Sequence, residues 1–149
     1  MNDFDFLEGE WNVENRWLKR FLDDCDEWED IPGRSTCIRL FDGAGNIDWI
    51  EFPTLEKKGL TLRLWRPASE DWALYWANDT TGVLFPPVFG GFSEGIGTFF
   101  GDDTQDGRPV RVRFIWSGMD EGAPRWEQAF STDDEKTWEI NWVMKFSRK

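Results

Sequence analysis

Apolar and polar residues alternate along much of the sequence, and this pattern limits the folds that the chain can adopt. In 138–146 the even-numbered positions are apolar and the odd-numbered ones mostly polar, and 110–116 and 126–130 repeat the pattern. The alternation extends upstream to 60–64 and 72–76. A period of two places successive side chains on opposite faces of a β-strand. Each segment is therefore predicted to be a strand with its apolar face toward a core.

Turn-forming residues divide the chain into about ten short strands. The remaining strands are predicted at 10–18, 26–31, 35–41, 46–52 and 95–100. Clusters of Gly, Pro and Asp, such as Pro32-Gly33 and Asp106-Gly107, separate them. This spacing favours an all-β barrel or sandwich. We predict a single antiparallel, up-and-down barrel spanning 1–149, because a closed sheet has no unpaired edges.

The interior of such a barrel would be rich in aromatic rings. The chain has 11 Trp and 13 Phe but one Tyr, and each large ring can bury about 150–250 Å². Apolar walls with a few polar groups are typical of small-molecule pockets. On this basis the candidate ligand-binding residues are Asn15, Trp17, Trp76, Thr98, Trp116, Trp126, Gln128 and Trp142. The same rings could instead fill the barrel, and the sequence is compatible with both interiors.

The charge of the chain argues against polyanionic partners. Asp and Glu outnumber Lys and Arg by 29 to 17, which gives a net charge of −12, and the longest basic cluster is Lys57-Lys58. Nucleic-acid binding requires a basic surface, so neither nucleic acid nor an anionic membrane is expected as a partner.

The first residues lack the basic and apolar segments of a signal peptide. We expect a cytoplasmic protein in which Cys25 and Cys37 are reduced.

Histidine is absent from the sequence. This excludes a Ser-His-Asp triad, a Cys-His pair, an imidazole-based zinc site and haem held by a proximal His. No pair of carboxylates stands out on the predicted inner face, so we expect no catalytic residue, metal or cofactor. An enzyme that positions an apolar substrate is the alternative, with acid–base work by Asp, Glu, Tyr75 or Lys.

A short motif at the start of the first predicted strand resembles a lipocalin signature. Gly9-Glu10-Trp11 is similar to the G-x-W motif that begins the first strand of lipocalins and their calycin relatives. The resemblance implies a barrel of the lipocalin or fatty-acid-binding-protein type. In lipocalins the Trp plugs the closed end, and an Arg near the end of the last strand packs across it. Trp11 and Arg148 are at the matching positions here.

The chain as a whole resembles a bacterial family of calycin-like proteins that has no established activity. The resemblance supports the fold and implies no function. It is carried by four segments: Phe4-Asp-Phe-Leu-Glu-Gly-Glu-Trp11, Phe85-Pro-Pro-Val-Phe-Gly-Gly-Phe92, Gly101-Asp-Asp103 and Arg125-Trp-Glu-Gln-Ala-Phe130.

Two acidic segments are interpreted as turns. One, Ser131-Thr-Asp133-Asp-Glu135-Lys-Thr137-Trp138, resembles the Asp-box S-x-D-x-G-x-T-W of sialidases, with Glu135 in place of Gly. In that motif an acidic side chain braces a hairpin, so the resemblance implies a structural role. The other, 101–107, lacks the flanking helices and distal Glu of a calcium loop and is predicted to be a hairpin turn.

The segment 85–92 is not predicted to be a central strand. Pro86 and Pro87 fix φ, whereas Gly90 and Gly91 permit most conformations. Its aromatic residues could form a lid over the barrel mouth, contact a second subunit or close the bottom of the core.

Taken together, these features predict a binding protein that holds a small apolar or aromatic molecule inside a barrel lined by Trp and Phe. Asn15 and Gln128 are expected to orient a polar end of the ligand. A filled barrel that forms a homodimer through its aromatic segment is the other alternative. A carbohydrate-binding surface would require several of the Trp residues to be exposed.

Overall fold

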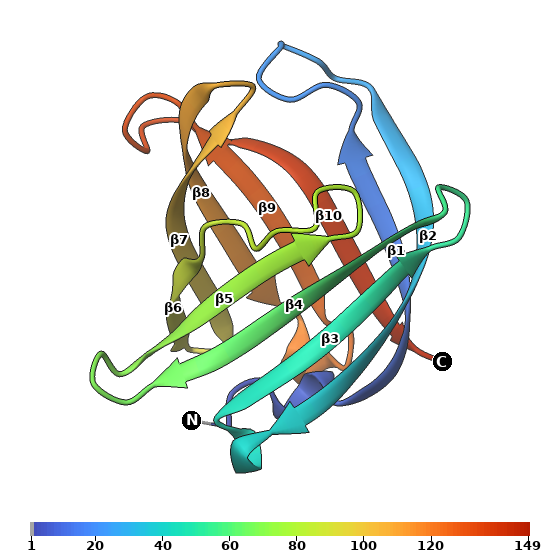
Figure 1. Ribbon diagram of the computed structural model, residues 1–149, viewed down its shortest axis with the longest axis vertical. Helices are drawn as coiled ribbons and strands as arrows, with labels where there is room; N and C mark the ends of the chain where they lie inside the picture. The colour runs from blue at the N-terminus through green and yellow to red at the C-terminus, as the bar shows by residue number, and fades with distance from the viewer. Residues whose placement is uncertain (1) are drawn as a thin grey trace.

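Ten antiparallel strands close into a barrel in the computed structural model, which describes residues 2–149 (Figure 1). Each strand pairs with its neighbours in sequence, and the first pairs with the last. This confirms the predicted all-β, up-and-down architecture. The strands are β1 (Gly9–Leu18), β2 (Trp28–Leu40), β3 (Gly45–Phe52), β4 (Lys57–Arg66), β5 (Asp71–Asn78), β6 (Val88–Ser93), β7 (Ile96–Gln105), β8 (Arg108–Ser117), β9 (Arg125–Ser131) and β10 (Glu139–Arg148). Short 3-10 helices are η1 (Asp5–Leu7), η2 (Phe41–Gly43) and η3 (Met119–Glu121).

The predicted turn at Pro32-Gly33 is wrong, because 26–31 and 35–41 contribute to one long strand, β2. β3 pairs with β2 only from Arg34 onward. Pro32 therefore lies where β2 has a neighbour on one side only, and there a missing backbone N–H is tolerated. Gly33 faces the interior, where a Cβ would lie 2.8 Å from Nδ2 of Asn15.

The prediction for 85–92 is also wrong, because Val88–Ser93 forms β6. Gly90 makes this strand possible: a Cβ at this position would collide with the carbonyl oxygen of Thr98 on β7. β6 pairs with only three residues of β5. Phe89 lies on the outer face, and the guanidinium of Arg66 is 4.2 Å from its ring centroid. The segment is thus part of the barrel wall, and only its beginning borders the open end.

β4 has the predicted alternation but the opposite orientation. Arg63 is inside the barrel and 5% exposed. Its Nη1 lies 2.6 Å from Oδ2 of Asp48 and donates a hydrogen bond of 2.9 Å to Oδ1 of Asn46. Both partners are on β3, and Asn46 is directly opposite Arg63 in the sheet. The leucines that alternate with Arg63 consequently face outward: Leu60, Leu62 and Leu64.

A bulge changes the orientation at the start of β10. The register shifts between Ile140 and Trp142, which turns Ile140 outward (38% exposed) and buries Asn141 completely. Trp138 precedes the strand and packs on the outer face, with its ring centroid 6.0 Å from that of Phe100. The predicted even-numbered apolar face is therefore correct only from Trp142 onward.

The N-terminal segment closes one end of the barrel, at the bottom of Figure 1. Trp11 donates a hydrogen bond from Nε1 to the carbonyl oxygen of Leu7 at 2.8 Å. The Arg148 guanidinium lies 3.7 Å from the centroid of the Trp11 ring and donates to the carbonyl oxygens of Glu8 and Phe6. This is the plug that the G-x-W resemblance implies.

Aromatic rings fill the half of the barrel above this plug. Phe4 is at the centre of the cluster, with its ring centroid 5.0 Å from that of Trp72, 4.9 Å from Phe92 and 5.8 Å from Phe99. The Arg63 guanidinium lies over Phe4 at 5.2 Å and over Trp116 at 5.7 Å. The closed half is therefore a packed core that includes the Arg63–Asp48 ion pair.

The Asp-box-like segment braces the hairpin between β9 and β10, as its resemblance implies. Asp133 accepts hydrogen bonds from Oγ1 and N of Thr137 and from Oγ of Ser131. These bonds, with the Thr137 hydroxyl contributing most, lower the pKa of Asp133 from 3.8 to about 2. The segment 101–107 ends in the predicted turn, but β7 continues to Gln105 before it.

Both cysteines are free thiols, and Cys37 is buried beside the closed end. Burial raises the pKa of Cys37 from 9.0 to about 12.

Between residues 2 and 149, no helix combines the length and the apolar character needed to cross a membrane.

Candidate functional site

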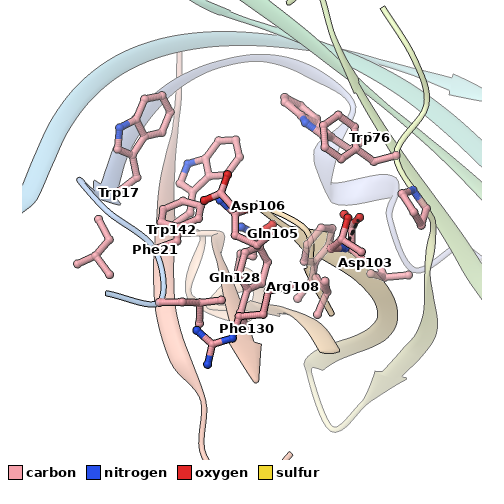
Figure 2. A pocket seen from close by; sticks show the side chains of 18 of the residues that line it. Trp17, Phe21, Trp76, Asp103, Gln105, Asp106, Arg108, Gln128, Phe130 and Trp142 are labelled. Carbon is pink, nitrogen blue, oxygen red and sulfur yellow. Dashed lines mark hydrogen bonds between the residues drawn. The ribbon is translucent and has the colours of Figure 1, made fainter. Parts of the chain in front are cut away.

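The open half of the barrel contains a cavity of about 840 Å³ (Figure 2). Its wall is formed by residues of β1 and of β5 to β10, and its rim by the β1–β2, β5–β6 and β7–β8 connections. The volume is in the range of small-molecule pockets, about 300–1,000 Å³. The barrel interior is therefore filled in its closed half and hollow in its open half.

Trp142 is at the centre of the aromatic wall of the cavity. Its ring centroid is 5.4 Å from that of Trp17, 5.8 Å from Trp76 and 5.1 Å from Trp126, each in an edge-to-face arrangement. Its Nε1 donates a hydrogen bond of 3.0 Å to Oδ1 of Asn15, which is 2% exposed. Both the rings and the indole N–H of Trp142 are thus held by contacts within the chain itself.

Gly59 on β4 provides the space that keeps the cavity open. A Cβ at this position would collide with the six-membered ring of Trp76. The two residues are on adjacent strands, since Gly59 is opposite Asn78 and Thr61 is opposite Trp76. The glycine thus leaves the space against β4 that the end of the Trp76 indole occupies.

Polar groups inside the cavity are few. Gln128 borders it and donates from Nε2 to Oδ1 of Asn141 at 2.9 Å. The Nδ2 atoms of Asn15 and Asn141 are buried and have no hydrogen-bond partner within residues 2–149. A buried donor without a partner is costly, so the layer of side chains behind the wall has unused hydrogen-bonding capacity.

Within residues 2–149, the charged side chains that line the cavity lie at its rim. Arg20 pairs with Asp23 at 3.1 Å, and Lys19 lies 3.9 Å from Glu27. Arg108 also lines the rim, where its Nη2 lies 3.5 Å from Oγ1 of Thr132. Asp103 and Asp106 complete this set (Figure 2). The site therefore has an apolar depth and a charged entrance, an arrangement that suits a molecule with one apolar and one polar end.

Four of the residues singled out in the sequence line the cavity together: Trp17, Trp76, Gln128 and Trp142. Asn15 and Trp126 lie directly behind them. Asn15 accepts the hydrogen bond of Trp142, and Trp126 packs its ring against Trp142 and Phe114.

Two residues singled out in the sequence lie elsewhere. Trp116 is in the filled half of the barrel, where its ring centroid is 5.5 Å from that of Phe6 and 5.3 Å from that of Phe146. The expectation for Thr98 is corrected by the register of β7: Phe99 points inward at 0% exposed, so Thr98 and its cross-strand partner Ile115 are on the outer face.

Several lining residues were not singled out in the sequence. Val112, Phe114 and Phe130 belong to the alternating pattern that predicted β8 and β9, and their inward positions follow from that pattern. Phe21 and Phe85, in contrast, are in loops, where no periodicity indicates which side chains reach the cavity.

No protein-family model matches the chain, and no curated protein matches it.

Proposed function

We propose that this protein binds a small amphiphilic molecule, with the apolar or aromatic part of the ligand held in the open half of the barrel. The cavity of about 840 Å³, walled by Trp17, Trp76 and Trp142, is the observation that carries the proposal. The rings provide apolar surface, and Gln128 provides a polar group within it. The charged rim would face the polar end of the ligand.

Apolar burial would supply most of the affinity. A ligand that loses roughly 300 Å² of apolar surface to this wall would gain about 7 kcal/mol. The loss of translational and rotational freedom offsets several kcal/mol of that gain. Polar contacts with Gln128 or the rim are then needed for tight binding, so an amphiphile is favoured over a pure hydrocarbon.

We also propose that the barrel belongs to the calycin superfamily. Three features support this assignment: the meander of ten strands, the indole of Trp11 at the closed end, and the Arg148 side chain across it. The assignment is consistent with a binding function, but architecture alone does not identify a ligand.

A binding titration tests the proposal. The purified protein would be titrated with saturated fatty acids and with aromatic amphiphiles, by calorimetry and by Trp fluorescence. Trp76→Ala should weaken binding at least ~10-fold, which corresponds to about 1.4 kcal/mol. Trp28→Ala is the matched control, because Trp28 lies on the outer face of the barrel. There it packs on Arg16, which points away from the interior because it alternates along β1 with the inward-facing Asn15 and Trp17. If no amphiphile gives a saturable signal, or if the two variants behave alike, the cavity is not the binding site.

A further inference from the structure

One carboxylate belongs to the wall of the cavity. Asp103 lies on β7 four residues after Phe99, which is 0% exposed inside the barrel, and it is opposite Val110, which is 4% exposed. Because side chains alternate along a strand, Asp103 points inward. It is half-buried and lines the cavity (Figure 2). The other charged residues of the lining lie in connections or at the first residue of a strand: Lys19, Arg20, Asp23, Asp106 and Arg108.

No cation of the described chain pairs with Asp103. Within residues 2–149 it forms no ion pair, and its Oδ1 accepts a hydrogen bond of 2.7 Å from the N–H of Thr104. A carboxylate has about four lone-pair sites, so this bond leaves most of its acceptor capacity unused. A charge that is partly removed from water is stabilised by an opposite charge beside it. Asp103 therefore presents a negative group to the cavity that a bound cation would neutralise.

The cations at the rim are less able to select an anion. Lys19 and Arg20 each pair with an acidic residue of the β1–β2 connection. Arg108 is exposed at the start of β8, and its Nη2 lies 3.5 Å from Oγ1 of Thr132. The chain as a whole has a net charge of −12, and such a field raises the local concentration of cations. The charge of the whole chain and the unpaired Asp103 thus favour a ligand of the same sign.

The aromatic rings of the cavity favour a cation as well. The face of an indole carries negative electrostatic potential and attracts a cation that lies over it. Arginine side chains already lie over rings elsewhere in the chain, as Arg113 does over Trp138. Within residues 2–149, none lies over Trp17, Trp76 or Trp142. The rings that line the cavity therefore keep this capacity for a ligand.

We propose that the cavity selects an organic cation, an amphiphile whose amine or ammonium group pairs with Asp103. This inference rests on the proposed binding function and adds the charge of the ligand to it. The apolar part of the ligand would contact Trp76 and Trp142. An anionic amphiphile, such as a fatty acid, would bring a second carboxylate toward Asp103, and the repulsion would weaken its binding.

Calorimetric titration with three compounds that share one apolar group tests this inference. Phenylbutylamine, phenylbutyrate and phenylbutanol have a positive, a negative and a neutral polar end near pH 7. The wild-type protein should bind the amine at least ~10-fold more tightly than the carboxylate. Asp103→Asn removes the charge and keeps an oxygen for the N–H of Thr104. It should weaken binding of the amine at least ~10-fold and leave binding of the alcohol unchanged.

Asp102→Asn is the matched control. Asp102 is the adjacent residue of β7 and points outward, where its Oδ1 lies 3.4 Å from Nη1 of Arg111. The substitution changes the net charge of the chain by the same amount without altering the cavity, so it should leave binding of all three compounds unchanged. Circular dichroism would check that both variants are folded. If Asp103→Asn does not fold, Asp103→Ser replaces it, with the same expected loss of amine binding.

Several results would overturn the inference while the binding function stands. One is equal affinity of the wild type for the amine and the carboxylate. Another is an amine preference that survives Asp103→Asn, or that both variants weaken equally, which would make it an effect of net charge. Tighter binding of the carboxylate, lost in Arg108→Gln, would show that the rim selects an anion. If none of the three compounds gives a saturable signal, nor any other amphiphile, the binding function fails and this inference fails with it.

Discussion

Replacing a Trp in the filled half of the barrel should cost much more stability than replacing one beside the cavity. Trp116 is 1% exposed, and its ring packs against those of Phe6 and Phe146. Trp116→Ala leaves a void that a closed barrel cannot collapse around, so we expect a loss of about 3–5 kcal/mol. Trp76 is half-buried and borders the cavity. Trp76→Ala removes roughly 100 Å² of buried contact and should cost about 2 kcal/mol.

Urea unfolding followed by far-UV circular dichroism would measure both losses without relying on Trp fluorescence. The slope of the unfolding free energy against urea concentration should be the same in wild type and both variants, so that the midpoints report stability directly. Trp116→Ala should unfold at clearly lower urea than Trp76→Ala. Equal losses, or a larger loss for Trp76→Ala, would refute the distinction between a filled and a hollow half.

Three further outcomes follow from individual residues. Gly59→Ala should push the Trp76 indole into the cavity, weaken ligand binding in calorimetry and cost about 1–3 kcal/mol in overpacking. At pH 8, Ellman's reagent should modify Cys25 quickly and Cys37 only after unfolding, because the buried thiol has its pKa raised to about 12; rapid modification of both would contradict this. Asp133, whose pKa is lowered to about 2, stabilises its hairpin above pH 4, and this contribution should be lost as the pH falls toward 2. Amide exchange in the hairpin should show that transition in the wild type but not in Asp133→Asn.

The sequence was sufficient for the architecture but not for the orientation of every strand. A period of two shows that the faces alternate, and it does not show which face is inside. Leu60 and Leu62 were expected in the core, yet Arg63 takes the interior because Asp48 and Asn46 on β3 face it. That interaction depends on the pairing of β3 with β4. The residues of 60–64 alone contain no pattern that would predict it.

The number of strands was predicted correctly because two errors compensated. The turn expected at Pro32-Gly33 divided β2 into two strands, and the glycines in 85–92 concealed β6. In both segments, close contact explains why Gly is present: with the Asn15 side chain at Gly33 and with the β7 backbone at Gly90. Gly33 and Gly90 mark positions where another strand or side chain leaves no room for a Cβ. Local turn propensity cannot distinguish this use of glycine from a turn.

The cavity could be predicted only in part. Alternation correctly indicated that Trp76 and Trp142 face the interior, but whether a ring fills or lines the barrel depends on its rotamer. For Trp76 that choice is tied to Gly59 across the sheet, which sequence reasoning did not identify. Trp116 has the same pattern and is in the packed half. The two Trp residues differ in their distance from the closed end. Trp116 lies in the half that the N-terminal segment closes, and Trp76 lies in the open half.

Native mass spectrometry tests the central claim most directly, because it weighs the folded protein with whatever its cavity retains. The protein would be examined as purified and after incubation with the amphiphile panel, and each sample again after denaturation. We expect one ligand per chain of 17.5 kDa, lost on unfolding and retained less by Gly59→Ala. A folded protein that shows only its bare mass after exposure to the whole panel would contradict a ligand-binding barrel.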